Sequence, residues 1–434
     1  MRSAGRITRS SGAPADLVIR GARLFDPGSR VDVATDLRIQ SGIISEIGSN
    51  LAAPQVIEAA GRTLFPAFID PHVHLRTPGQ EWKETLATGT AAAAAGGFCT
   101  ILAMPNTDPV VDSVEVLVAL HERASREARV GVGFLATITV GQKGEQLAEL
   151  GALADAGAVG FSDDGLPVRS AGMLRRALQY AQITGRVLSL HCEDPALSPN
   201  AQMHEASVSA ELGLSGYPSI AEATMVARDL MIAAFERQPL HLCHLHVSES
   251  ALAVRRARED GVDVSAEASP HHLLLTHDEA RSLDANRFKM SPPLAADDHR
   301  RAIVDAVRDG TIDCIATDHA PHHAAEKAVP WEAAPPGIIG LESAVPSIYA
   351  GLVVPGVLSL ETVVTRMTAG PARAFGLDCP RIALGELANL ALWKLDDRYV
   401  FTEADIRSKA KNSAFLGREL QGRCELTIAH GVVA

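Results

Sequence analysis

The middle of the chain consists of eight short apolar segments that alternate with helical patterns. The apolar segments span residues 65–74, 98–106, 130–139, 158–164, 186–194, 239–247, 262–269 and 313–321. Between them lie amphipathic patterns such as EQLAELGALADAGA and DHRRAIVDAVRDG, several of which close with the glycine that commonly ends a helix. Strands that alternate with helices indicate a parallel sheet, and eight such units predict an α/β fold, a (β/α)8 TIM-like barrel. A doubly wound open sheet is the alternative, but no glycine-rich phosphate loop opens the first helix.

The two ends of the chain have a different pattern, with short β-branched strands broken by turns that contain glycine. These ends cover residues 15–65 and 378–434, and the barrel would span 66–377. Because the termini of a domain often lie close together, we expect the two ends to form one small composite β domain. Residues 1–14 contain three arginines and lack the apolar core of a secretory signal, which predicts a disordered tail, with an organellar address as the alternative.

Charge and cysteine usage limit the class of function. The formal net charge is -12, and there is no long basic run of the kind that binds nucleic acid. No apolar stretch approaches the roughly 20 residues that a membrane span requires. The six cysteines form no CxxC pair, which is typical of reduced thiols in the cytosol. The sequence therefore predicts a cytoplasmic protein that acts on a small molecule.

Histidine and aspartate residues stand where the predicted strands end. They are His72 and His74, Asp163 and Asp164, His191, His244 and His246, and Asp318 with His319. The carboxyl ends of parallel barrel strands meet at one rim, which is where polar residues carry out chemistry. Imidazole and carboxylate groups are ligands for divalent metals, and there are enough here for two ions bridged by a carboxylate. A single histidine at a strand end is usually structural, but five strands with such residues indicate a metal centre.

Several longer motifs resemble the amidohydrolase superfamily, and within it the bacterial dihydroorotases in which an aspartate bridges the metals. The motifs are HVHLR, TGTAAAAAGGFCTILAMPNT, FSDDG, LHCED, ATDHAPH and PPGIIGLESAVP, and the resemblance covers nearly the whole chain. Related hydantoinases and allantoinases use a carboxylated lysine as the bridge, in a strand where this chain reads GFSDDG. The absence of lysine there favours a dihydroorotase.

The resemblance implies a zinc-dependent enzyme with two Zn²⁺ ions per subunit. His72, His74 and Asp318 would bind the first ion, His191 and His244 the second, and Asp164 would bridge them. His246 is the alternative to His244. Asp318 would also act as the general base and then as the general acid.

The same resemblance implies the substrate contacts. Arg76 would bind a substrate carboxylate, because its guanidinium is planar and permanently charged. The other expected contacts are His74, Asn106, Ser291 and His322. Ser291 stands where the family usually has asparagine, and Thr77 replaces the usual acidic residue after Arg76, so these two departures bear on substrate specificity.

The implied activity is the reversible conversion of L-dihydroorotate to N-carbamoyl-L-aspartate in de novo pyrimidine biosynthesis. One alternative is another cyclic amidohydrolase, of the hydantoinase or allantoinase type. The other is a non-catalytic partner of aspartate transcarbamoylase. A homodimer is expected, and association of an active enzyme with aspartate transcarbamoylase stays open.

Overall fold

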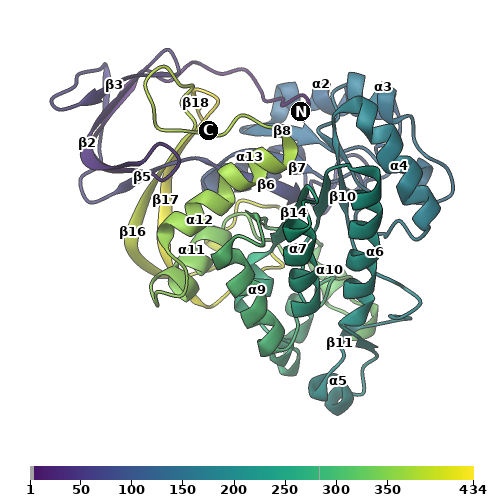
Figure 1. Ribbon diagram of the computed structural model, residues 1–434. Helices are drawn as coiled ribbons and strands as arrows, with labels where there is room; N and C mark the ends of the chain where they lie inside the picture. Colours follow the sequence, from purple (N-terminus) through teal and green to yellow (C-terminus); the bar gives the residue numbers. More distant parts are fainter. Residues whose placement is uncertain (1–3, 283) are drawn as a thin grey trace.

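The computed structural model describes residues 4–282 and 284–434. Its centre is a closed barrel of eight parallel strands, with helices packed around it (Figure 1). The strands are β6 (Phe68–Val73), β7 (Phe98–Ala103), β8 (Gly131–Phe134), β9 (Gly160–Phe161), β10 (Val187–Leu190), β13 (Leu240–Leu242), β14 (Val264–Ala268) and β15 (Cys314–Ile315). Single parallel bridges, Ala136 to Phe161 and Val73 to His319, join the two sheets into a ring. The predicted (β/α)8 barrel is confirmed. Each observed strand is shorter than its apolar segment, because the last residues leave the sheet as loops that carry the polar side chains.

Helices surround the barrel, and each packs an apolar face against the strands. They are α1 (Leu86–Ala95), α2 (Val114–Glu127), α3 (Leu150–Asp155), α4 (Ala171–Thr184), α6 (Ile220–Glu236), α7 (Ser248–Glu259), α9 (Asp297–Asp309) and α12 (Leu360–Met367). Shorter elements in the connections include β11 (Met203–His204), α5 (Ser207–Leu212), β12 (Gly216–Tyr217), α8 (Pro270–Leu274), α10 (Ala324–Lys327), α11 (Ala344–Ile348) and α13 (Ala369–Phe375). Helix α9 is an example of the local signals. Two aspartates in its first turn interact favourably with the helix dipole, and Gly310, with a φ of 92°, ends the helix.

A second, largely antiparallel sheet lies beside the barrel and takes strands from both ends of the chain (Figure 1). Its order is β18 (Val432–Val433), β17 (Glu419–Ala429), β16 (Leu390–Val400), β5 (Thr63–Pro66), β1 (Leu17–Asp26), β2 (Val31–Gln40) and β3 (Ile43–Gly48), with β4 (Gln55–Glu58) paired to β1. Strand β5 pairs in register with β16, more than 300 positions later in the sequence. The two ends of the chain thus contribute to one sheet, as expected for a composite β domain. The ranges 15–65, 66–377 and 378–434 stay our proposed domain limits.

The N-terminal segment differs from its prediction. Residues 1–3 lie outside the described part of the chain, but Thr8 forms an antiparallel bridge to Val132, with N–O distances of 2.8 and 2.9 Å. The Oγ1 atom of Thr8 also lies 2.9 Å from Nδ1 of His121. The prediction of a disordered tail is therefore wrong for this segment. Glycines on β8 leave room for it: a Cβ added at Gly133 would lie 2.9 Å from Ile7.

Within the described residues, no helix has both the length and the apolar character needed to cross a membrane.

Candidate metal centre and active site

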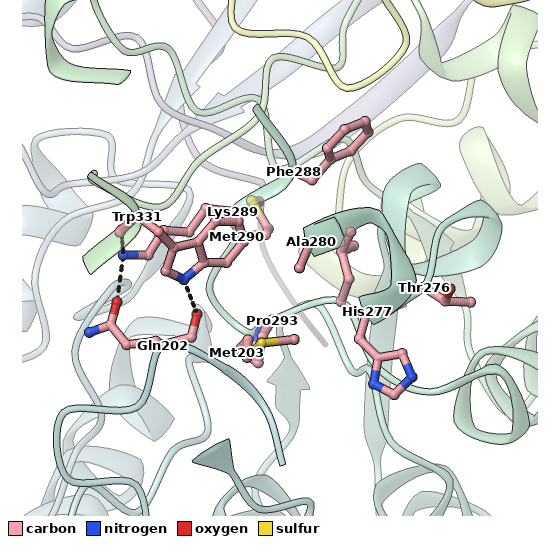
Figure 2. A pocket seen from close by; sticks show the side chains of 11 residues that line it. Gln202, Met203, Thr276, His277, Ala280, Phe288, Lys289, Met290, Pro293 and Trp331 are labelled. Carbon is pink, nitrogen blue, oxygen red and sulfur yellow. Dashed lines mark hydrogen bonds between the residues drawn. The ribbon is translucent and has the colours of Figure 1, made fainter. Parts of the chain in front are cut away.

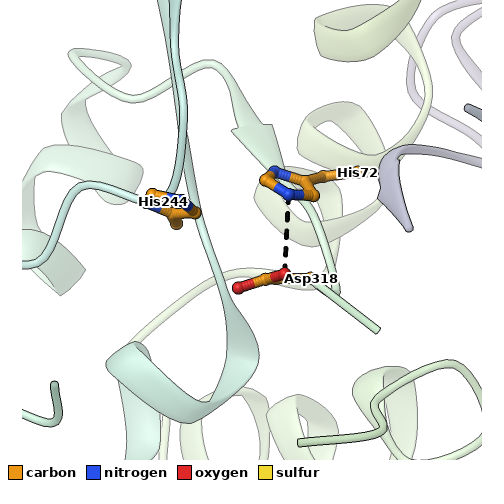
Figure 3. Close-up of side chains that lie close together, drawn as sticks. All are labelled: His72, His244 and Asp318. Atoms are coloured by element: carbon orange, nitrogen blue, oxygen red, sulfur yellow. Dashed lines mark ion pairs between the residues drawn. The ribbon is translucent and has the colours of Figure 1, made fainter. Parts of the chain in front are cut away.

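The six residues predicted as metal ligands lie together at the carboxyl ends of the barrel strands. They are His72, His74, Asp164, His191, His244 and Asp318, and all are buried. His72 and His74 leave the end of β6, and the other four follow β9, β10, β13 and β15. Their ligand atoms form overlapping groups, each of which could hold a metal ion (Figure 3).

Asp164 occupies the centre of this cluster and faces both halves of it. Its Oδ2 atom lies 3.5 Å from Nε2 of His72 and 3.5 Å from Nε2 of His74. Its Oδ1 atom lies 3.5 Å from Nε2 of His244 and 3.8 Å from Nδ1 of His191. Asp318 completes the first half, with Oδ1 at 3.5 Å from His72 and 3.1 Å from His74 (Figure 3). Asp164 thus presents Oδ2 to His72 and His74, and Oδ1 to His191 and His244.

These separations fit a divalent cation. Four ligands on a tetrahedral ion with bonds of 2.0–2.1 Å lie about 3.3 Å from one another, close to the distances observed here. In addition, Nε2 of His72 and Oδ1 of Asp164 are buried without a hydrogen-bond partner. Buried polar atoms are rarely left unpaired, so these two point to a ligand in each half of the cluster, one beside His72 and one beside Oδ1 of Asp164.

The charges of the cluster also favour a cation. Burial by itself lowers the pKa of His72, but the carboxylates of Asp164, Glu267 and Asp318 raise it well above the ordinary value. Burial likewise opposes ionisation of Asp164, yet the neighbouring histidines hold its pKa well below the usual range. The carboxylates of the cluster thus attract positive charge, which a divalent ion would supply in place of the histidine protons.

The backbone conformation of the site is unusual. Arg76, His244 and Asp318 have φ values of 55°, 30° and 47°, in the left-handed region that non-glycine residues seldom adopt. Such strain is typical of functional sites, where the surrounding structure holds side chains in directions that a regular strand would not give.

The structure places His244, and not His246, in the cluster. The Nδ1 atom of His246 donates to Oε2 of Glu222 at 2.5 Å, and its ring packs against Tyr217. The residue before Asp164 is also turned away: Asp163 accepts hydrogen bonds from the backbone of Ile138 and from Thr139. Asp163 thus has a structural role, since neighbouring residues on an extended segment point to opposite faces.

A cavity of about 220 Å³ opens onto the metal cluster. All five predicted substrate-contact residues line it: His74, Arg76, Asn106, Ser291 and His322. Nη2 of Arg76 donates to Nε2 of His322 at 3.3 Å, and its Nε donates to the carbonyl of Pro321 at 3.1 Å. Asn106 is held by Nδ1 of His74, which donates to its Oδ1 at 2.8 Å.

Comparison with known proteins assigns the family. The family model described as dihydro-orotase-like matches residues 61–250. The dihydroorotase of Geobacter sulfurreducens is 44% identical over 421 residues, which cover 96% of this chain and 99% of the relative. The dihydroorotase of Bacillus caldolyticus is 44% identical over 402 residues, 92% of this chain and 94% of the relative. The chain belongs to the dihydroorotase-like family.

Solved structures similar to this family member confirm the fold. The D-hydantoinase of Thermus sp. has a TM-score of 0.80 at 26% identity, and the L-hydantoinase of Arthrobacter aurescens has 0.85 at 24%. Each comparison covers 96% of this chain and 95% of the solved chain. The barrel and its accompanying sheet are therefore shared with hydantoinases, although sequence identity to the dihydroorotases is much higher.

Three residues that support the site of this dihydroorotase-like chain were not predicted. Glu267 contacts His72 from below the cluster, and Asn412 accepts from the backbone N–H of His322 and donates to the carbonyls of Ala320 and Gly337. Gly337 lies against His322, where a Cβ would come within 2.7 Å of the imidazole. For Glu267 a signal existed, because a charged residue in the apolar run VSAEAS has to be paired when buried. Nothing local marks Asn412, which lies far away in the sequence.

A smaller pocket lies next to the catalytic cavity (Figure 2). Met290 lines both of them. Nζ of Lys289 donates to Oε1 of Gln202 at 2.7 Å and to the carbonyl of Trp331 at 2.6 Å, and Nε1 of Trp331 donates to the carbonyl of Gln202 (Figure 2). The protein's own groups thus satisfy the ammonium of Lys289 and the indole N–H of Trp331. These bonds anchor the segment that leads to Gly337 at the cavity.

Proposed function

We propose that this chain is a dihydroorotase, which converts L-dihydroorotate to N-carbamoyl-L-aspartate and back, within de novo pyrimidine biosynthesis. The near full-length similarity to dihydroorotases supports this proposal. We further propose two Zn²⁺ ions per subunit, with His72, His74 and Asp318 on the first, His191 and His244 on the second, and Asp164 between them. A homodimer in the cytoplasm is part of the proposal, and association with aspartate transcarbamoylase is a further hypothesis.

The observation that carries the proposal is the buried guanidinium of Arg76 at the cavity. Burial lowers the pKa of Arg76 to about 10, so the side chain stays charged at neutral pH. Among the described residues no carboxylate forms an ion pair with it, and those of Asp318 and Asp164 act on it only over a longer distance, although a buried charge normally has a direct partner. A substrate carboxylate would provide it. Dihydroorotate has one, whereas the ring of hydantoin itself has none.

His322 prepares Arg76 for this role. Burial and the charge of Arg76 lower the pKa of His322 to about 2, so the imidazole is neutral and can accept from the guanidinium. Asn106 is prepared in a similar way, because His74 occupies its carbonyl oxygen and leaves the amide N–H groups to donate. We propose that Arg76, Asn106 and His322 bind the substrate carboxylate, and that Ser291 contacts the ring.

Asp318 is placed to move the proton of the reaction. A divalent cation held by the cluster would polarise the amide carbonyl and make water more acidic. Burial opposes ionisation of Asp318, but His72 and His74 lower its pKa below the ordinary value, so it is an ionised carboxylate that can accept a proton. We propose that Asp318 takes the proton from the attacking water and gives it to the departing ring nitrogen.

Removal of metal tests the proposed zinc dependence. We expect dialysis against a chelator to abolish hydrolysis of dihydroorotate, and Zn²⁺ added back to restore it, with two ions bound per chain by elemental analysis. Folding should survive, because the barrel core does not depend on the cluster, and circular dichroism would check this. Full activity in protein shown to contain no metal would contradict the proposal.

A further inference from the structure

The carboxylate of Glu267 lies beneath the metal cluster and contacts groups from three parts of the barrel. Glu267 is on β14 and is fully buried. Its Oε1 atom lies 2.5 Å from Nδ1 of His72 and 3.2 Å from the backbone nitrogen of His244. Its Oε2 atom lies 3.0 Å from Nε2 of His241. One side chain thus joins β6, β13 and the loop that follows β13.

The contact with His72 determines which nitrogen faces the cluster. An ionised carboxylate only accepts hydrogen bonds, so Nδ1 of His72 must carry the proton that it donates. The same oxygen faces the backbone N–H of His244, which can only donate, so Oε1 is placed as an acceptor toward His72 as well. The Nε2 atom of His72 faces Asp164 and Asp318, and with a cation in the cluster it would present its lone pair to that cation.

The contact with His244 supports a strained backbone. His244 has a φ of 30°, which a histidine adopts only when other groups hold it there. Its N–H donates to the same oxygen that accepts from His72. His241 occupies the second oxygen, and its Nδ1 lies 2.8 Å from Oγ of Ser265. Rotation of the carboxylate would therefore break its contacts with His72, His244 and His241 together.

We propose that Glu267 is a positioning residue of the metal centre, which aligns one histidine from each of the two metal-binding groups through a single oxygen. His72 belongs to the group around the first ion and His244 to the group around the second. The inference rests on the metal centre of the proposed function. Hydrogen bonding to the outer nitrogen of a metal-binding histidine commonly changes metal affinity 10–100-fold.

The chain contains a matched control for this proposal. Glu222 is also buried, and it accepts from Nδ1 of His246 at 2.5 Å and from the backbone nitrogen of the same residue at 3.3 Å. It has the same kind of contacts as Glu267, but with a histidine outside the metal cluster. Glu222→Gln therefore measures the cost of weakening a buried carboxylate–histidine pair in general.

The test is a titration of metal-free protein with Zn²⁺ in competition with a coloured chelator. We expect Glu267→Gln to weaken binding of both Zn²⁺ equivalents by about 10–100-fold, and Glu222→Gln to change it less than about twofold. The absorption spectrum of the Co²⁺-loaded protein gives a second readout, because it reports the geometry of the ligands. Glu267→Asp, which keeps the charge but shortens the side chain, is expected to weaken binding as well, and decides the question if Glu267→Gln does not fold.

Zn²⁺ binding by a folded Glu267 variant as tight as in the wild type would overturn the inference. Equal losses in the Glu267 and Glu222 variants would overturn it too, since the effect would then be general to buried pairs. The titration contains no substrate. If the wild-type protein binds Zn²⁺ but does not act on dihydroorotate, the proposed function fails while the inference about Glu267 stands.

Discussion

Replacement of Asp318 by asparagine is expected to lower kcat for dihydroorotate by about a thousandfold. General acid–base groups contribute 10²–10⁴ to the rate, and an amide cannot take up the proton that the ionised carboxylate accepts. The remaining carbonyl oxygen can still face His74, which lies 3.1 Å from Oδ1 in the wild type. We therefore expect most of the metal to stay bound. The measurement is kcat together with metal content on one preparation.

The metal content separates the two roles of Asp318. If Asp318→Asn retains its metal and loses turnover, the residue acts in proton transfer as well as in binding. If kcat stays within tenfold of the wild type while the metal is retained, proton transfer by Asp318 is excluded. Heat denaturation of Asp318→Asn and of the wild type should give similar midpoint temperatures, because asparagine and aspartate have nearly the same volume.

Replacement of Arg76 by methionine is expected to raise KM for dihydroorotate by about 10–100-fold, with a smaller change in kcat. A hydrogen bond to a charged group is worth about 1.5–3 kcal/mol, and each 1.4 kcal/mol corresponds to a factor of ten. Methionine fills similar space without the charge. Arg76→Lys should give an intermediate KM, because an ammonium lacks the planar pair of donors.

The expected result depends on where the substrate carboxylate binds. Arg76 contacts no metal-binding residue in the bonds described above, so its loss should not change metal content. An unchanged KM in Arg76→Met would show that the carboxylate binds elsewhere, and would remove the main reason to prefer dihydroorotate over an uncharged cyclic amide.

Much of the site could be predicted because strand geometry is simple. Residues two apart on an extended segment share a face, so the pattern of His72 and His74 indicated two ligands for one site. The same alternation separates Asp164 from Asp163, and the structure agrees, since only Asp164 faces the cluster. The alternation of strand and helix was enough to predict a barrel whose strand ends bring these residues together.

The parts that were missed, or left with an alternative, depend on contacts between residues distant in the sequence. Glu267 lies 195 positions after His72, and no local pattern indicates that pairing. His244 and His246 have the same strand parity, and what separates them is the buried partner Glu222 on another element. The segment around Thr8 was predicted to be a disordered tail because its bridge partner, Val132, is also distant in the sequence.

The most direct test of the central proposal is a comparison of kcat/KM for dihydroorotate, hydantoin and allantoin on one metal-analysed preparation. If the cavity binds a carboxylate through Arg76, dihydroorotate should be preferred by at least about a hundredfold, because a buried charge left unpaired strongly disfavours the uncharged substrates. N-carbamoyl-L-aspartate should cyclise on the same preparation. Hydrolysis of hydantoin without hydrolysis of dihydroorotate would contradict the proposal.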